Sequence, residues 1–223
     1  MVQAKNIFQQ AWWLFKSPFV YKNPLWYLAA RNDEPVLVSF WSGGRLLVRD
    51  SGDAIVVNEI FLGGIYDHVL QGCASMIDVG GHIGCASLRA WQLGARQIVT
   101  YEPHPANYYV CKKNLVGKAH VIEAAVNAHK GTATLHFGMN SGTHSLHSEG
   151  PGVEVWTVTL ENPSADVLKI DAEDAEYGIL LAANLSRVRR LVVETTDTRV
   201  AELLRQRGFA TTEHDLLVTA VKT

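Results

Sequence analysis

The sequence predicts an α/β protein with a parallel sheet covered by helices on both faces. From residue 75 onward, short runs rich in Val and Ile alternate with helical stretches, which is typical of parallel strands joined by crossover helices. The first of these strands runs into MIDVGGHIGCAS, residues 76–87, where an apolar run meets an acid and then a glycine-rich turn. Open α/β sheets bind ligands at such a point, beyond the carboxyl ends of the strands.

The length and composition of the chain indicate one globular domain with a terminal elaboration. We expect an N-terminal extension at 1–54 and a main domain at 55–223. A hydrophobic fraction of 48% supplies a core, and a formal net charge of −2 argues against a broad nucleic-acid surface. Three cysteines in apolar surroundings indicate reduced thiols and a cytoplasmic location. No run reaches the ~18 apolar residues of a membrane span, and the N-terminus makes a poor signal peptide.

The N-terminal extension is rich in aromatic residues and then changes to a β pattern. We expect its first 30 residues to form a helix that packs its aromatics on the domain, with an interfacial helix, a lid or a dimer contact as alternatives. Two β-rich runs flank Ser42, Gly43 and Gly44 and predict a hairpin. We expect residues 54–70 to form a short strand and a helical turn.

The main domain alternates strands and helices in chain order. The patterns predict strands at 75–79, 97–102, 119–126, 166–171, 188–196 and 215–221, and helices at 84–93, 105–115, 175–184 and 199–209. Residues 132–137 and 153–160 look like extra or edge strands.

The turn after the first strand has the chemistry of a nucleoside site. Gly80 and Gly81 let the backbone turn tightly, and Gly84 lets the next helix start close to the sheet. Asp78 would repel a phosphate, so it suits a ligand with a cationic or hydroxyl-rich part. His82 stands where a dinucleotide fingerprint needs its second glycine, which disfavours NAD. An S-adenosylmethionine (SAM) site tolerates this turn, and the ammonium and sulfonium charges of SAM favour a nearby acid.

A second acid follows at the end of the next strand. A carboxylate at Glu102 can accept both ribose hydroxyls of a nucleoside that lies across the strand ends, and Pro103 stops the strand there. Because such an acid serves NAD and SAM equally, Glu102 alone does not discriminate between them.

Several stretches, taken together, resemble the FkbM-type SAM-dependent methyltransferases. They are IDVGGHIGCASLRAWQLGARQIVTYEPHPANYYVCKKNL, VIEAAVNAHKGTATLHF, HSLH, VTL, DVLKIDAEDAEYGIL and LVVE, in this order over roughly residues 55–210. The resemblance implies a Rossmann-like class I methyltransferase fold, with a seven-stranded sheet whose last strand runs antiparallel. It also implies SAM as cofactor and a hydroxyl of a sugar or polyketide-like product as acceptor. Two departures are His82, where the family usually has Asn, and Asp174, where it usually has Gly.

The acids after the fourth main strand are candidates for catalysis. Methyl transfer needs the acceptor aligned in line with the methyl group and, for a hydroxyl, a base that takes its proton. Asp171 ends the strand at the carboxyl edge of the sheet, and Glu173 and Glu176 share a face if the segment is helical. The alternative is that these acids complement the helix dipole, which is the role we favour for Asp174. Lys169 either pairs with a carboxylate or faces the site.

The remaining site residues follow from the resemblance. Ala124 and Ala125 are expected to form a thin wall against adenine, and Ser145 to contact the methionine end of SAM. His144 and His147 lie in a glycine-flanked loop, which we expect to be a mobile loop on the acceptor side and not a zinc site. Glu194 lines the acceptor pocket or pairs with Lys169. No metal is expected.

The function predicted is therefore O-methylation of a small molecule or glycan. N-methylation of an amino group, RNA or protein, and a SAM- or nucleoside-binding module without turnover, remain alternatives. An NAD-dependent oxidoreductase is disfavoured by His82. A homodimer formed through the aromatic N-terminus is plausible.

Overall fold

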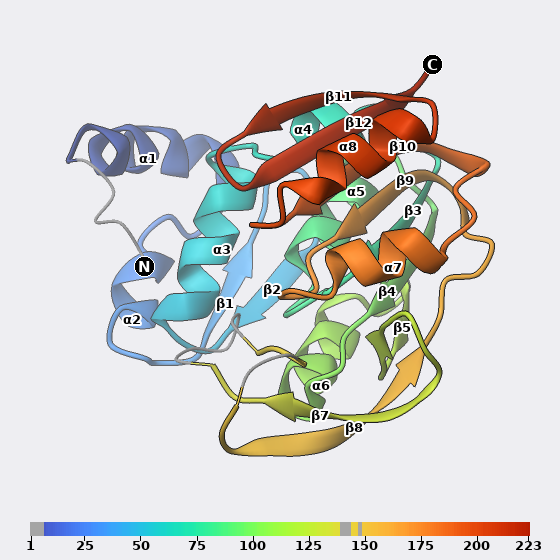
Figure 1. Cartoon of the computed structure of the whole chain (residues 1–223). Coiled ribbons are helices and arrows are strands. Elements are labelled where there is room, and N and C mark those ends of the chain that lie inside the picture. The colour runs from blue at the N-terminus through green and yellow to red at the C-terminus, as the bar shows by residue number, and fades with distance from the viewer. Residues whose placement is uncertain (1–6, 139–143, 147–148) are drawn as a thin grey trace.

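A computed structural model describes residues 7–138, 144–146 and 149–223 (Figure 1). Its centre is a seven-stranded sheet in the order β11-β12-β10-β9-β3-β4-β5. The strands are β3 (Ser75–Val79), β4 (Gln97–Tyr101), β5 (His120–Ile122), β9 (Ser164–Ile170), β10 (Arg187–Glu194), β11 (Phe209–His214) and β12 (Leu217–Lys222). The last strand, β12, runs antiparallel to both of its neighbours, whereas β3, β4, β5, β9 and β10 pair in parallel. The α/β class, the seven strands and the antiparallel last strand are therefore confirmed.

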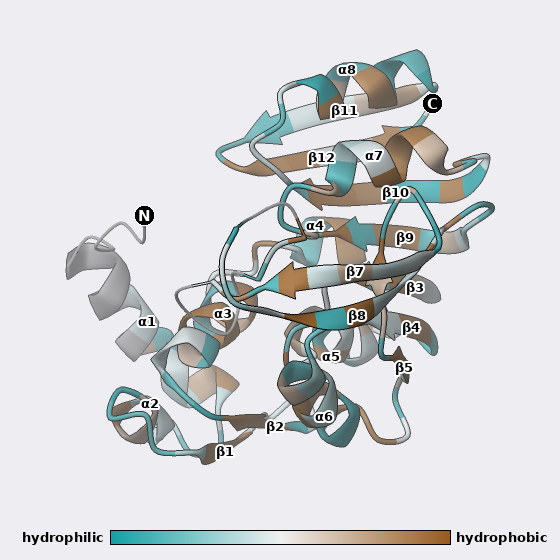
Figure 2. Ribbon diagram, turned by 60° about the horizontal axis from the view of Figure 1, so that its bottom comes forward, coloured by the Kyte–Doolittle hydropathy of each residue, from teal (hydrophilic) through white to brown (hydrophobic). Residues whose placement is uncertain are grey.

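Helices cover both faces of this sheet, as predicted. Successive residues of a strand point to opposite faces, and β9 shows this clearly, since Val167 and Leu168 belong to different buried clusters. On the Val167 face lie α3 (Ser51–Phe61), α5 (Cys85–Gln92) and α6 (Pro105–Asn114). On the Leu168 face lie α7 (Glu176–Ala182) and α8 (Arg199–Gln206), and Figure 2 shows α8 lying along β11.

A smaller sheet lies beside the large one. It contains β6 (Ala125–Val126), β8 (Gly152–Val158) and β7 (Gly131–His136), in that order. Strands β7 and β8 pair antiparallel over Gly131–His136, so the extra strands expected in this region are present. The prediction of one continuous strand at 119–126 is wrong. These residues form two strands, β5 in the large sheet and β6 in the small one.

The N-terminal segment forms two helices and a hairpin. They are α1 (Ile7–Val20), α2 (Trp26–Ala30), β1 (Val36–Ser39) and β2 (Arg45–Val48), and the antiparallel register of β1 and β2 confirms the predicted hairpin. The aromatic side chains do not all pack on the domain as expected. Tyr21 and Trp26 are buried, whereas Trp12, Phe15 and Phe19 on α1 are exposed.

Residues 54–70 differ most from the sequence prediction. They contain most of α3 and all of α4 (Asp67–Leu70), and no strand. The buried apolar side chains here follow helical spacing, with Ala54, Val57 and Phe61 on one side of α3. The expected boundary between residues 54 and 55 thus falls inside a helix. Within the described part of the chain, no helix is long and apolar enough to cross a membrane.

Candidate active site

One pocket lies beyond the carboxyl ends of β3, β4 and β9. Eight of the thirteen residues chosen from the sequence line it: Gly80, His82, Glu102, Pro103, Ala124, Ala125, Asp171 and Glu173. The other five, Asp78, Gly81, Gly84, Ser145 and Glu176, lie around the pocket without lining it. The structure thus brings together residues that are up to 93 positions apart in sequence, at the edge of the sheet where they were expected.

The glycine turn after β3 is too crowded for side chains. Gly80 has φ +76°, and a Cβ there would meet the backbone oxygen of Asp171 at 1.8 Å. A Cβ at Gly81 would meet Cγ2 of Thr100 at 2.2 Å. Gly84 has φ +94° and packs against Leu115. These contacts bring the turn close to both neighbouring strands, which leaves the space above it for a ligand.

Glu102 forms part of the pocket wall and is only 4% exposed. Its two carboxylate oxygens accept backbone N–H groups, one from His82 at 2.7 Å and one from His104 at 2.9 Å. Burial raises the pKa of Glu102 to about 7, although these N–H donors favour the ionised form. The two bonds fix the orientation of the carboxylate at the position proposed for ribose recognition.

Asp78 lies below the turn and is fully buried. It accepts a hydrogen bond from Oγ of Ser87 at 2.7 Å and lies 3.3 Å from Nζ of Lys169. Lys169 also donates to the carbonyl of Gly80 at 2.7 Å and lies 3.3 Å from Asp171. Burial would lower the pKa of Lys169, but Asp78 and Asp171 raise it above its usual value. The lysine therefore joins the turn to the acid at the end of β9.

The segment after β9 brings two of the catalytic candidates to the pocket. The Asp171 side chain is 33% exposed. Burial, followed by the charge of Asp171, raises the pKa of Glu173 to about 7. Glu176 is buried and accepts the N–H of Ala172 at 2.8 Å, a contact that helps to fix the conformation of the segment. Oγ of Ser145 donates to the carbonyl of Glu173 at 2.8 Å, so this serine also holds the segment.

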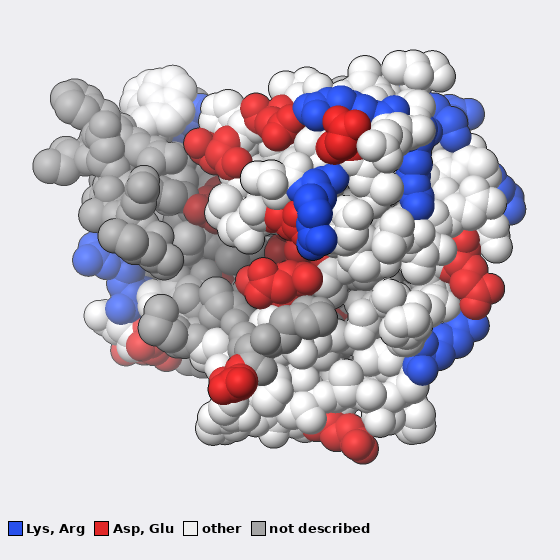
Figure 3. Space-filling model, viewed as in Figure 1, with Lys and Arg blue, Asp and Glu red and all other residues white. Residues whose placement is uncertain are grey.

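Two side chains next to these acids were missed from the sequence. The hydroxyl of Tyr66 donates to Glu194 at 3.1 Å, and Glu59 lies close enough to influence the same carboxyl. Burial, followed by the charge of Asp171, raises the pKa of Glu194 to about 7. Figure 3 shows acidic side chains gathered around the hollow at the centre of this face. The rim thus favours cations over anions.

Histidines border the opposite side of the pocket. The rings of His104 and His144 stack with centroids 4.3 Å apart, and Phe137 meets His104 edge-on at 5.7 Å. Burial lowers the pKa of His144 to about 4, so its ring is neutral at pH 7. His147 lies outside the described residues. Among the residues that are described, no group of three His, Cys, Asp or Glu side chains is arranged to hold a metal ion.

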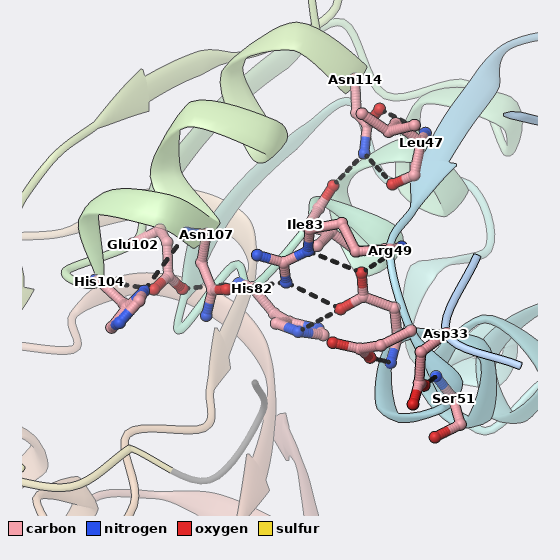
Figure 4. A network of polar contacts seen from close by, with 12 residues as sticks. Asp33, Leu47, Arg49, Ser51, His82, Ile83, Glu102, His104, Asn107 and Asn114 are labelled. Carbon is pink, nitrogen blue, oxygen red and sulfur yellow. Dashed lines mark hydrogen bonds and ion pairs between the residues drawn. The ribbon is translucent and has the colours of Figure 1, made fainter. Parts of the chain in front are cut away.

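A polar network from the N-terminal segment reaches this site and was also missed (Figure 4). Asp53 of α3 is paired with Arg49 and lies 2.9 Å from Nε2 of His82. Arg49 in turn donates to Oδ1 of Asn107, a pocket residue, at 2.8 Å. An acid in the first turn of α3 is expected at a helix N-terminus, but nothing local in the sequence points from Asp53 to His82.

The donor set of the pocket fits SAM. Glu102 can accept the two ribose hydroxyls, and Ala124 and Ala125 offer a flat, apolar wall to adenine. Asp171 gives the other end of the pocket a carboxylate, which suits the ammonium and the sulfonium of SAM. The same carboxylates would oppose the pyrophosphate of NAD.

The sheet order, the antiparallel last strand and this pocket define a class I methyltransferase fold. The chain belongs to the FkbM methyltransferase family, since residues 78–211, more than half of its length, match the family described as Methyltransferase FkbM domain. It is therefore a methyltransferase with SAM as its cofactor, which confirms the resemblance noted in the sequence.

Solved structures of low sequence identity are similar to the chain. The magnesium protoporphyrin IX methyltransferase of Synechocystis PCC 6803 with bound SAM is 13% identical, over 77% of this chain and 80% of that one, with a TM-score of 0.44. The ribosomal protein L11 methylase of Lactobacillus delbrueckii subsp. bulgaricus is 10% identical, over 75% and 80%, with a TM-score of 0.46. The tRNA methyltransferase TrmK of B. subtilis is 13% identical, over 73% and 65%, with a TM-score of 0.46. No curated protein matches the chain in sequence.

Proposed function

We propose that this methyltransferase transfers the methyl group of SAM to a hydroxyl of a small molecule or glycan. The observation that carries this proposal is the position of Glu173. Its carboxyl lines the pocket next to Asp171 and has a pKa of about 7. A base with a pKa near the working pH is suited to take the proton of a hydroxyl as the new bond forms.

The residues have separate roles in this proposal. SAM supplies an activated methyl group on its sulfonium. Glu102, held by two backbone N–H groups, accepts the ribose hydroxyls. Asp171, held at 3.3 Å from Lys169, orients the acceptor hydroxyl, and a carboxylate oxygen of Glu173 takes its proton. With SAM bound, the acceptor oxygen would bond to the methyl carbon as the methyl–sulfur bond breaks, and S-adenosylhomocysteine would be left. Alignment of the reacting atoms at ~3–3.5 Å provides most of the acceleration.

The charge of the pocket rim supports a small acceptor over RNA. Asp171 and Glu173 line the pocket, and Glu194 lies close enough to Asp171 to interact with its charge. A phosphate backbone would be repelled there, whereas polyhydroxylated or amino-bearing acceptors would not.

The first test is a calorimetric titration of SAM, S-adenosylhomocysteine and NAD into the wild-type protein and a Glu102→Ala variant. We expect both adenosyl ligands to bind the wild type, the variant to lose that binding, and NAD to bind neither. Binding of NAD alone would contradict the cofactor role of the pocket.

The acceptor is then sought with isotopically labelled SAM and a panel of hydroxylated glycans and metabolites, each matched with an amine analogue. Products methylated on oxygen support the proposal, and products methylated only on nitrogen contradict it. Glu173→Gln should lower kcat at least tenfold with little change in SAM affinity, because it removes the base. Glu154→Gln, which changes an exposed acid of β8, serves as the matched control.

A further inference from the structure

His82 has a strained backbone at the centre of the cofactor turn. Its φ is +50°, in the left-handed region that residues other than glycine seldom adopt. Asn, Asp and His adopt this region more often than other side chains do, but still at a cost in free energy. A histidine here therefore needs support from its surroundings.

Asp53 provides that support from α3. Its carboxylate is fully buried, and Oδ1 lies 2.9 Å from Nε2 of His82. Arg49 fixes the same carboxylate through three donors, with its backbone N–H at 2.8 Å, Nε at 2.9 Å and Nη2 at 2.8 Å. Burial would raise the pKa of Asp53, but the bonds from Arg49 and His82 hold it well below its usual range. The carboxylate of Asp53 is therefore an anion in a fixed position, and it holds the imidazole ring of His82.

The backbone N–H of His82 connects the contact with Asp53 to the pocket. While its ring is held by Asp53, its N–H donates to Oε2 of Glu102 at 2.7 Å. Figure 4 shows the chain of contacts from Arg49 through His82 to Glu102. Rotation of residue 82 out of the left-handed region would turn this N–H away from Glu102 and leave one oxygen of a buried carboxylate without its donor.

We propose that Asp53 is a positioning residue for the cofactor. It holds His82 in the left-handed conformation, and through His82 it sets the orientation of the Glu102 carboxylate. The proposal rests on the ribose-binding role proposed for Glu102. Asp53 lies before residue 78, where the family match begins, so the proposal gives this N-terminal segment a role in cofactor binding. Neither the glycine turn nor Glu102 reveals that role by itself.

The test is a double-mutant cycle read by calorimetric binding of S-adenosylhomocysteine. We expect Asp53→Asn to weaken binding about tenfold in the wild-type background, which is the scale of losing the left-handed conformation. His82→Asn supplies the second background, because it removes the imidazole that Asp53 contacts. In the His82→Asn background, Asp53→Asn should weaken binding by less than about threefold, so the effects of the two changes are not additive. Asp67→Asn is the matched control, since Asp67 also pairs with an arginine, Arg89, outside the pocket.

Equal losses from Asp53→Asn in both backgrounds would overturn the proposal, because they would show a role that bypasses His82. If Asp53→Asn fails to fold, a second pair of variants decides. His82→Gly should bind about tenfold more tightly than His82→Ala, since glycine adopts positive φ freely and alanine does not. Equal affinity of these two variants would overturn the proposal as well. A failure of the ribose role proposed for Glu102 can be told apart from a failure of the role proposed for Asp53. In the first case, Glu102→Ala would bind S-adenosylhomocysteine as tightly as the wild type does.

Discussion

The affinity of the pocket for adenosine should rise about tenfold between pH 6 and pH 8. The pKa of Glu102 is about 7 in the free protein because the group is buried. About a tenth of the molecules therefore carry an ionised Glu102 at pH 6 and about nine tenths at pH 8. The ionised carboxylate can accept both ribose hydroxyls, whereas the protonated form has lost part of its acceptor capacity. The apparent dissociation constant scales inversely with the competent fraction, which gives the tenfold change.

Adenosine is the ligand to use for this measurement. It keeps the ribose and adenine but lacks the ammonium and sulfonium, so the acids around Asp171 do not enter the result. His144 also stays neutral in this range, since burial lowers its pKa to about 4. Calorimetry at pH 6, 7 and 8 measures the dissociation constant directly.

Two variants complete the experiment. Glu102→Gln should bind weakly at every pH and show no slope, because the titrating group is gone. His82→Asn removes an imidazole whose charge lowers the pKa of Glu102, while a backbone N–H remains at residue 82. The affinity should therefore still rise with pH, but over a higher pH range than in the wild type. An affinity that is flat in the wild type, or a slope that persists in Glu102→Gln, would refute the assignment of Glu102 to the ribose.

Three further outcomes are expected. Gly80→Ala should destabilise the fold by about 3 kcal/mol or more in urea denaturation, because its Cβ would lie 1.8 Å from a backbone oxygen; a loss below about 0.5 kcal/mol would contradict this crowding. Lys169→Met should cost about 3–5 kcal/mol because it leaves Asp78 buried without its cation, and adding Asp78→Asn should restore part of the loss. The carboxyls of Glu173 and Glu194 each have a pKa of about 7 in the fold, against an ordinary value of 4.5, so the folded state holds more protons between these values. The free energy of unfolding should therefore fall by about 2 kcal/mol per group from pH 5 to pH 7, and a rise in Tm over this range would argue against these values.

The strands of the large sheet could be predicted where helices cover both faces. Residues 75–79 form β3 as expected, since a central parallel strand packed against helices on both faces has a short run of mostly apolar side chains, here Met76, Ile77 and Val79. The sequence of β11, Phe209–His214, shows no such run because it is an edge strand with mostly exposed side chains. Backbone pairing with β12 holds it in the sheet, and composition does not reveal that pairing.

The strand expected near residue 55 shows how β-branched residues can mislead. Ile55, Val56 and Val57 favour strands locally, but they belong to α3. The side chain of Asp50 accepts the N–H of Asp53 at 2.8 Å and caps this helix. The cap and the helical spacing of the buried residues were both present in the sequence, and together they outweigh local propensity.

The site divides into a local part and a part that depends on the tertiary fold. The glycine turn and Glu102 follow their strands directly, so short motifs are enough to find them. The contact between Tyr66 and Glu194 spans 128 residues, and no spacing rule anticipates it. Asp78 was expected to face the cofactor. Side chains alternate along a strand, so Asp78 points to the same face as Met76, into the core under α5.

The hydrophobic core under α5 is continuous with the N-terminal hairpin. Val38, Phe40 and Leu46 are buried in the same cluster as Met76 and Leu88. A fragment cut at the start of the family match, residue 78, would expose this cluster to water at ~1.5–3 kcal/mol for each large side chain. The smallest unit that folds cooperatively therefore extends back beyond residue 38. Any chimera that exchanges cofactor domains between relatives has to carry this hairpin with the sheet it covers.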